Sequence, residues 1–231
     1  MKATRTPSRL SDSLQHQLNM YALAASAAGV GMLALAPAAE AKIVYTQANL
    51  RIRVNHGIIN LDLNHDGIND FQFSARYGYY RHSGTSTWGE EMWVGPAQQS
   101  NQVWGFVSST WSALCADPLP RGQKVGPKGH FYPGGQIMVS EFQHAGGGGW
   151  RKCAWFDAKA YLGLKFIIKG QTHYGWARVK TAGRFGGSRP IITGYAYETV
   201  PNRPIITGKK QGRVDGDALP ATLGGLALGR K

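Results

Sequence analysis

Acidic residues are scarce in this chain. Its 231 residues include 13 Asp plus Glu against 26 Lys plus Arg, which gives a formal net charge of +13 at neutral pH. Such a charge favours anionic partners, among them acidic polysaccharide, lipopolysaccharide, nucleic acid and anionic lipid. The basic residues are dispersed and no nucleic-acid-binding motif is present. Nucleic acid is therefore the weakest of these candidates.

Recognised catalytic motifs are missing as well. The chain has no G-x-S-x-G, no H-E-x-x-H and no C-x-x-C, the patterns that mark several hydrolases and redox proteins. Four carboxylates are candidates for the acid pair that a glycosidase needs: Glu90, Glu91, Glu141 and Asp157. The sequence favours a non-enzymatic protein. The alternative is a secreted polysaccharide hydrolase that uses Glu90, Glu91 or Glu141.

Cysteine is limited to Cys115 and Cys153. In an exported protein an even pair predicts one disulfide, and two free thiols are the alternative. A loop of this length would stabilise the fold by about 4 kcal/mol if the gain comes from lost chain entropy in the unfolded state. Two cysteines so far apart have too few partners for a metal site.

The N-terminus has the order of a secretory signal peptide. A basic leader is followed by an apolar run over residues 21–38 and by Ala39-Glu40-Ala41, an A-x-A cleavage pattern. The sequence thus predicts removal of residues 1–41 and a secreted or cell-surface location. The alternative is an uncleaved anchor, although Ala and Gly make the run weakly hydrophobic for a membrane span.

Helical periodicity is absent after residue 41, and period-two patterns replace it. Strands are expected at residues 58–63, 71–80, 102–107, 161–169, 172–179 and 191–200. The pair 161–169 and 172–179 reads as a hairpin around Gly170-Gln171. Segments 81–101 and 112–136 read as long loops, and 144–150 as a flexible loop. These patterns predict an all-β fold, a β-sandwich or jelly roll over residues 42–208.

One acidic cluster stands out in LDLNHDGINDFQF, residues 61–73. Oxygen atoms at alternate positions and a glycine at the turn are the requirements of a calcium loop. The predicted ligands are Asp62, Asn64, Asp66, the Ile68 carbonyl and Asp70. Phe73 stands where an EF-hand has a bidentate Glu, so calcium binding is expected to be weak and structural. An Asx-rich turn without metal is the alternative.

This loop resembles the D-x-D/N-x-D-G-x-x-D calcium loops of dockerins, thrombospondin type 3 repeats and FG-GAP blades, although the chain has one copy. YLGLKFIIKGQTHYGWARVK (161–180) and TGYAYETVPN (193–202) resemble the core of exported bacterial PEP-CTERM-type proteins of unknown function. The matching positions are Tyr161, Gly163, Leu164, Phe166, His173, Tyr174, Gly175, Trp176, Ala177, Ala196, Tyr197 and Glu198. The resemblance implies export from a bacterium and a sandwich-like fold, and no reaction.

Residues 209–231 read as a polar linker followed by a degenerate tail. LPATLGGLALGRK resembles the C-terminal sorting signal of PEP-CTERM proteins, but Pro-Ala-Thr replaces Pro-Glu-Pro. Its apolar part is also too short to span a membrane. A frayed tail is the alternative.

Aromatic residues in the C-terminal module offer a second possible role. Tyr174, Trp176 and Tyr197 either pack in a β core or form a stacking platform for sugar rings. The sequence leaves open whether four tryptophans line a cleft beside the glutamates: Trp88, Trp93, Trp104 and Trp111. The predicted function is non-enzymatic binding of anionic or neutral glycans at the cell surface or in the extracellular matrix. A matrix structural protein is a further alternative.

Overall fold

The computed structural model describes residues 42–82, 85–110, 112–181 and 190–211. The predicted signal peptide, Trp111 and the tail from residue 212 lie outside the described residues. The described residues contain no helix, and therefore none with the length and hydrophobicity needed to cross a membrane. The all-β prediction is confirmed.

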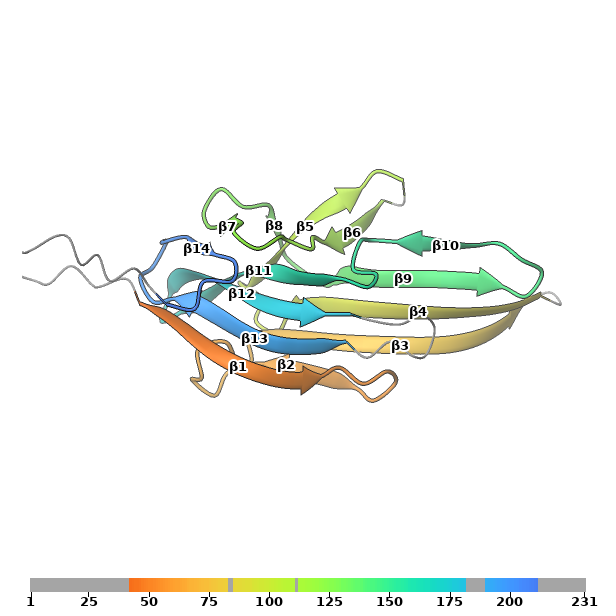
Figure 1. Ribbon diagram of the computed structural model, residues 1–231, viewed down its shortest axis with the longest axis horizontal. Coiled ribbons are helices and arrows are strands. Elements are labelled where there is room, and N and C mark those ends of the chain that lie inside the picture. Colours follow the sequence, from red (N-terminus) through yellow and green to blue (C-terminus); the bar gives the residue numbers. More distant parts are fainter. Residues whose placement is uncertain (1–41, 83–84, 111, 182–189, 212–231) are drawn as a thin grey trace, which may run out of the picture. The chain divides into compact units, whose positions relative to one another are not determined.

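Fourteen strands are present in the described part of the chain (Figure 1). They are β1 (Ile43–Arg51), β2 (Ile58–Leu61), β3 (Phe71–His82), β4 (Thr85–Pro96), β5 (Gln102–Ser108), β6 (Ala113–Ala116), β7 (Lys124–Val125), β8 (Phe131–Tyr132), β9 (Gln136–His144), β10 (Gly149–Lys152), β11 (Lys159–Ile168), β12 (Gln171–Lys180), β13 (Ile191–Glu198) and β14 (Ile205–Ile206). Twelve of them form one sheet, whose main path is β1-β13-β12-β11-β5-β6-β9-β4-β3-β2, while β14 and β7 pair separately.

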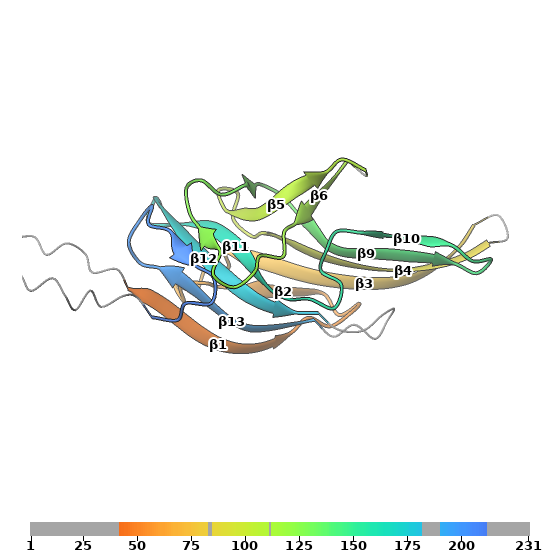
Figure 2. The ribbon, with the colours of Figure 1, turned by 45° about the horizontal axis from the view of Figure 1, so that its top comes forward.

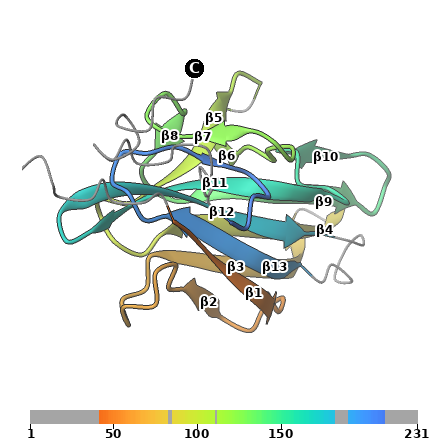
Figure 3. The same ribbon diagram turned by 60° about the vertical axis from the view of Figure 1, so that its left-hand side comes forward.

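This sheet folds back on itself and is nearly closed, like a barrel (Figures 2 and 3). One layer holds β1, β13, β12 and β11, the other holds β9, β4, β3 and β2, and β5 and β6 join them. The main hydrophobic core draws on both layers: Phe71, Phe73 and Met92 come from one, and Leu164 and Phe166 from the other. Burying large apolar side chains between layers is the main favourable term in such a fold.

The predicted hairpin of β11 and β12 is confirmed. The strands pair without a register shift from Lys159↔Lys180 to Ile168↔Gln171. Lys169 and Gly170 form the turn with φ of 49° and 77°, a conformation that suits glycine. Alternate residues of β11 enter the core, as the period-two pattern requires.

Two segments predicted as long loops contain strands. β4, a 12-residue strand, lies within 81–101, and β6, β7 and β8 lie within 112–136. The sequence of β4 hides its apolar alternation because Glu90 is buried on the core-facing side, next to Gly89 and Glu91. Pairing with β3 on one side and β9 on the other stabilises this strand. The segment 144–150 is a turn that ends in β10.

The predicted disulfide is present. Cys115 in β6 is bonded to Cys153, just after β10, and the two Cα atoms are 5.5 Å apart. The chain then buries Trp155, whose indole N–H donates to the Ala116 carbonyl oxygen at 2.9 Å. The crosslink therefore holds the start of β11 against the strands that join the two layers.

Candidate functional site

The acidic loop connects β2 and β3, and its first carboxylate organises the turn. The backbone N–H groups of His65 and Asp66 donate to Asp62 Oδ1 at 2.7 and 3.3 Å, and Gly67 N–H donates to Asp62 Oδ2 at 2.8 Å. His65 and Gly67 have φ of 61° and 85°. Asp66 accepts hydrogen bonds from Ile68 N–H and from the Asn64 amide, each at 2.9 Å. The Asx-turn interpretation is sufficient to explain this local geometry.

Asp70, the last predicted ligand, is buried at the base of the loop. Its carboxylate accepts from Leu63 N–H at 2.8 Å and from the Asn101 amide at 3.3 Å. Burial raises the pKa of Asp70 to about 6, while these two hydrogen bonds act in the opposite direction. Asp66 and Asp62 raise the pKa further by like-charge repulsion. A cation beside Asp70 would relieve this cost.

The donor set has the chemistry of a hard-cation site, since every predicted ligand is an oxygen. The Asn64 Oδ1 atom is buried and has no hydrogen-bond partner within the described ranges. Those ranges hold no group of three or more His, Cys, Asp or Glu side chains arranged around a metal. The oxygen ligands of this loop are therefore suited to a calcium ion. Calcium binding at the loop stays a prediction.

The stacking-platform interpretation of the C-terminal aromatics does not fit their burial. Tyr174 and Trp176 are 3% and 1% exposed and belong to a second hydrophobic cluster with Tyr161. The Trp176 ring meets Tyr161 edge-on, with centroids 5.2 Å apart. Tyr197 is half-buried and packs edge-on against Phe166. A sugar ring has no access to the buried rings of Tyr174 and Trp176, so the role of these two residues is packing.

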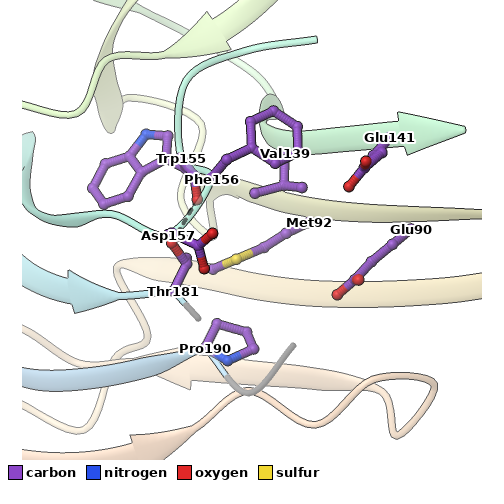
Figure 4. Close-up of a pocket in the computed structure, with 9 residues that line it drawn as sticks. All are labelled: Glu90, Met92, Val139, Glu141, Trp155, Phe156, Asp157, Thr181 and Pro190. Carbon is purple, nitrogen blue, oxygen red and sulfur yellow. Dashed lines mark hydrogen bonds between the residues drawn. The ribbon is translucent and has the colours of Figure 1, made fainter. Parts of the chain in front are cut away.

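The structure brings together three of the four candidate carboxylates. Glu90 and Glu141 are directly opposite each other on β4 and β9, and each is 4% exposed. Figure 4 shows both side chains projecting to the same side, with Asp157 lining the same pocket. The cavity there is about 10 Å³, room for a single water-sized sphere and too small for a sugar ring. Glu91 points to the other face of β4, where it accepts from the Ser140 hydroxyl at 3.1 Å.

Among the described residues, Arg151 lies beside this pair. The Arg151 guanidinium donates to Glu141 Oε1 at 2.7 Å, and it also packs 4.9 Å from the centroid of the Phe156 ring. These two contacts fix the position of the Glu141 carboxylate at the edge of the pocket.

A larger pocket lies elsewhere, against Trp104 at the start of β5. Its volume is about 450 Å³. Eight residues line it: Trp104, Gln123, Lys124, Gly126, Pro127, Lys128, Gly129 and Pro204. Glycines let this wall approach closely, because a Cβ on Gly129 would come within 2.5 Å of the Trp104 ring and one on Gly126 within 2.5 Å of Pro204. We call this site the Trp104 pocket.

Trp104 is 9% exposed, belongs to the same buried cluster as Tyr174 and Trp176, and is fixed by its neighbours. Phe131 meets it edge-on with centroids 5.4 Å apart, and the exposed His130 ring stacks on it at 6.0 Å with a 16° interplanar angle. Asp117 forms a side-chain hydrogen bond with Trp104. Burial raises the pKa of Asp117, and His130 and the Trp104 hydrogen bond oppose that rise. The indole is thus held rigidly, as a recognition surface requires.

Sequence reasoning did not locate the Trp104 pocket. The sequence leaves open whether Trp104 lines a cleft beside Glu90 or Glu141, and the structure places it in a different pocket from those glutamates. The pocket wall comes from Gly126-Pro127-Lys128-Gly129, inside a segment expected to be loop, and from Pro204, which is remote in sequence. The G-P-K-G motif was the available signal, since two glycines around a proline mark a tight turn.

Comparisons with family models, with curated proteins and with solved structures give no match to this chain.

Proposed function

We propose that this chain is an exported, non-enzymatic protein that binds a polysaccharide at the bacterial cell surface or in the extracellular matrix. The observation that supports it most is the Trp104 pocket. Ligand sites in proteins are concave, about 300–1,000 Å³ in volume, and combine apolar walls with a few polar groups. The Trp104 pocket, at about 450 Å³, has an indole and two prolines as apolar surface and Gln123, Lys124 and Lys128 as polar groups.

Export and calcium complete the proposal. Export rests on the signal-peptide pattern of residues 1–41 and on the resemblance to PEP-CTERM-type proteins. Calcium at Asp62–Asp70 would have a structural role, locking the connection between β2 and β3, and would not touch the ligand. The disulfide suits an oxidising compartment.

The test is a glycan array followed by calorimetry with the purified chain. We expect retention of at least one polysaccharide class without release of new sugar ends. Gln123→Ala and Trp104→Phe should each weaken binding about three- to tenfold, which corresponds to about 1 kcal/mol. Gln171→Ala, at an exposed position in the β11–β12 turn region, is the matched control and should bind normally. Absence of any glycan binding would reject the proposal, and self-assembly without ligand would support the structural-protein alternative.

A polysaccharide hydrolase is the second candidate, and the pairing of Glu90 with Glu141 is the observation that favours it. Glycosidases use a pair of carboxyl groups that flank the scissile bond. The cavity of about 10 Å³ would have to open before a sugar could enter. Reducing-end release that disappears in a Glu90→Gln/Glu141→Gln double variant would establish this activity and displace the binding proposal.

A further inference from the structure

Two segments far apart in the chain are basic and lack acidic residues. Residues 118–140 contain three basic residues and no Asp or Glu, and residues 199–211 contain three more and again no Asp or Glu. The six are Arg121, Lys124, Lys128, Arg203, Lys209 and Lys210. Along the sequence the positive charge is dispersed, because Lys128 of the first segment and Arg203 of the second are 75 positions apart.

The fold brings these two segments side by side. β7 pairs with β14 through Val125↔Ile205 and Lys124↔Ile206. Next to this pair, Gln123 N–H donates to the Thr207 hydroxyl, and Thr207 N–H donates to the Gln123 carbonyl oxygen, each at 2.9 Å. Figure 1 labels β7 and β14 next to each other. The charges of both segments therefore surround one region, and that region contains the Trp104 pocket.

All six basic side chains are exposed. Within residues 42–82, 85–110, 112–181 and 190–211, none of the six forms an ion pair with a described carboxylate. Lys210 lies 4.5 Å from the centroid of the Tyr45 ring, a contact that leaves its charge intact. Lys124 and Lys128 line the pocket itself. Positive charge of this density raises the local concentration of anions and speeds their association.

We infer that the polysaccharide bound at the Trp104 pocket is acidic, with carboxylate or sulfate groups on successive sugars. This inference rests on the proposed function. One sugar ring lies in the pocket beside Pro127 and Pro204, where Trp104, 9% exposed, offers a small part of its surface. The anionic group of this sugar faces Lys124 and Lys128, and neighbouring sugars along the polymer meet Arg121, Arg203 and Lys209. Single-stranded nucleic acid fits the site less well. Proteins that bind it stack successive bases on several aromatic rings, whereas Trp104 is the one aromatic side chain among the described residues that line this pocket.

The experiment compares two polymers with the same backbone. Polygalacturonate carries one carboxylate per sugar, and fully methyl-esterified homogalacturonan carries none. Calorimetry or affinity electrophoresis at about 50 mM salt should show the acidic polymer binding about tenfold more tightly, with the difference shrinking at about 500 mM salt because exposed charges are then screened. A sulfated polymer in the same assay distinguishes sulfate from carboxylate recognition.

Variants locate the effect. Lys124→Gln/Lys128→Gln should weaken binding of the acidic polymer about fivefold or more and leave the esterified polymer unaffected. The matched control is Lys159→Gln/Lys180→Gln, which removes two exposed lysines that pair across β11 and β12. This control has the same change in net charge and should retain tight binding.

The outcomes separate this inference from the proposed function. Equal affinity for the two polymers, or equal losses in the two double variants, overturns the acidic preference and leaves glycan binding standing. Binding to no polysaccharide on the array overturns both. Tighter binding of single-stranded DNA than of any acidic polysaccharide overturns the inference in favour of nucleic acid.

Discussion

Glu90 and Glu141 lie directly opposite each other on adjacent strands, and both are 96% buried. Like charges in this relationship destabilise a sheet, and burial increases the cost of each charge. The Arg151 guanidinium, bonded to Glu141 at 2.7 Å, is the compensation that the structure provides on one side of the pair. The Arg151 side chain is 42% exposed and the Glu141 side chain 6% exposed, so the two partners have unequal access to water.

This inequality predicts an asymmetric effect of mutation. Arg151→Gln leaves a buried carboxylate without its cation, and we expect a loss of about 1–3 kcal/mol in the free energy of unfolding. Glu141→Gln leaves an arginine that turns to water, with an expected loss below about 1 kcal/mol. Urea unfolding measures both, and Arg53→Gln at an exposed position is the control. Equal costs for the two variants would show that the pair does not stabilise the fold in this way.

A second prediction concerns Gly175 in β12. A Cβ there would lie 2.7 Å from Leu63 Cδ2 and 2.8 Å from the Ala196 carbonyl oxygen, and the carbonyl is backbone that cannot move aside. Gly175→Ala should lower the free energy of unfolding by about 1–3 kcal/mol, the usual cost of overpacking. The control is Gly146→Ala, since nothing lies within 4 Å of a Cβ at Gly146. A neutral result at Gly175 would mean that the acidic loop carrying Leu63 shifts without cost.

Local signals explain which parts of this fold could be predicted. The β11–β12 hairpin is encoded by alternation on both sides of a Lys-Gly turn, so its strands and inward-facing residues were predicted correctly. The disulfide followed from there being two cysteines. β4 was missed because its stability comes from partners on both sides, and because Glu90 occupies a core-facing position that a pattern rule treats as polar.

Of the two candidate sites, the acidic loop could be predicted from the sequence and the Trp104 pocket could not, because only the loop is formed by residues that are contiguous in the chain. The acidic loop is contiguous, so its residues could be named, and the turn geometry of Asp62 and Gly67 follows from them. The Trp104 pocket depends on β7 pairing with β14 and on Gly129 approaching an indole 25 residues earlier in the chain. No short-range pattern contains that information. Tyr174 and Trp176 show the converse, because strand alternation placed both on one face without revealing that this face is buried.

Calcium is the third prediction. At a calcium concentration about tenfold above the dissociation constant, binding to the folded state should add about 1.4 kcal/mol to the free energy of unfolding. The melting temperature should therefore rise with millimolar calcium and fall again with chelator. Asp66→Asn, which keeps an oxygen but removes a charge from the loop, should reduce the response, while Asp157→Asn outside the loop should not. A melting temperature that responds to neither calcium nor chelator would leave the Asx turn as the whole explanation of the cluster.

The fourth prediction is a pH dependence that arises from Asp117 beneath Trp104. Burial raises the pKa of Asp117 above its ordinary value of 3.8, so the folded state binds this proton more tightly than the unfolded state does. The stabilisation that Asp117 provides is therefore complete below pH 3.8 and is lost as pH rises through the folded pKa. Asp117→Asn resembles the protonated form at every pH. Relative to the unsubstituted chain, this variant should gain stability as pH rises from about 4 through the folded pKa of Asp117. Urea unfolding at four pH values measures that difference, in which the other titrating groups cancel, and a difference that stays constant or declines with pH contradicts a raised pKa.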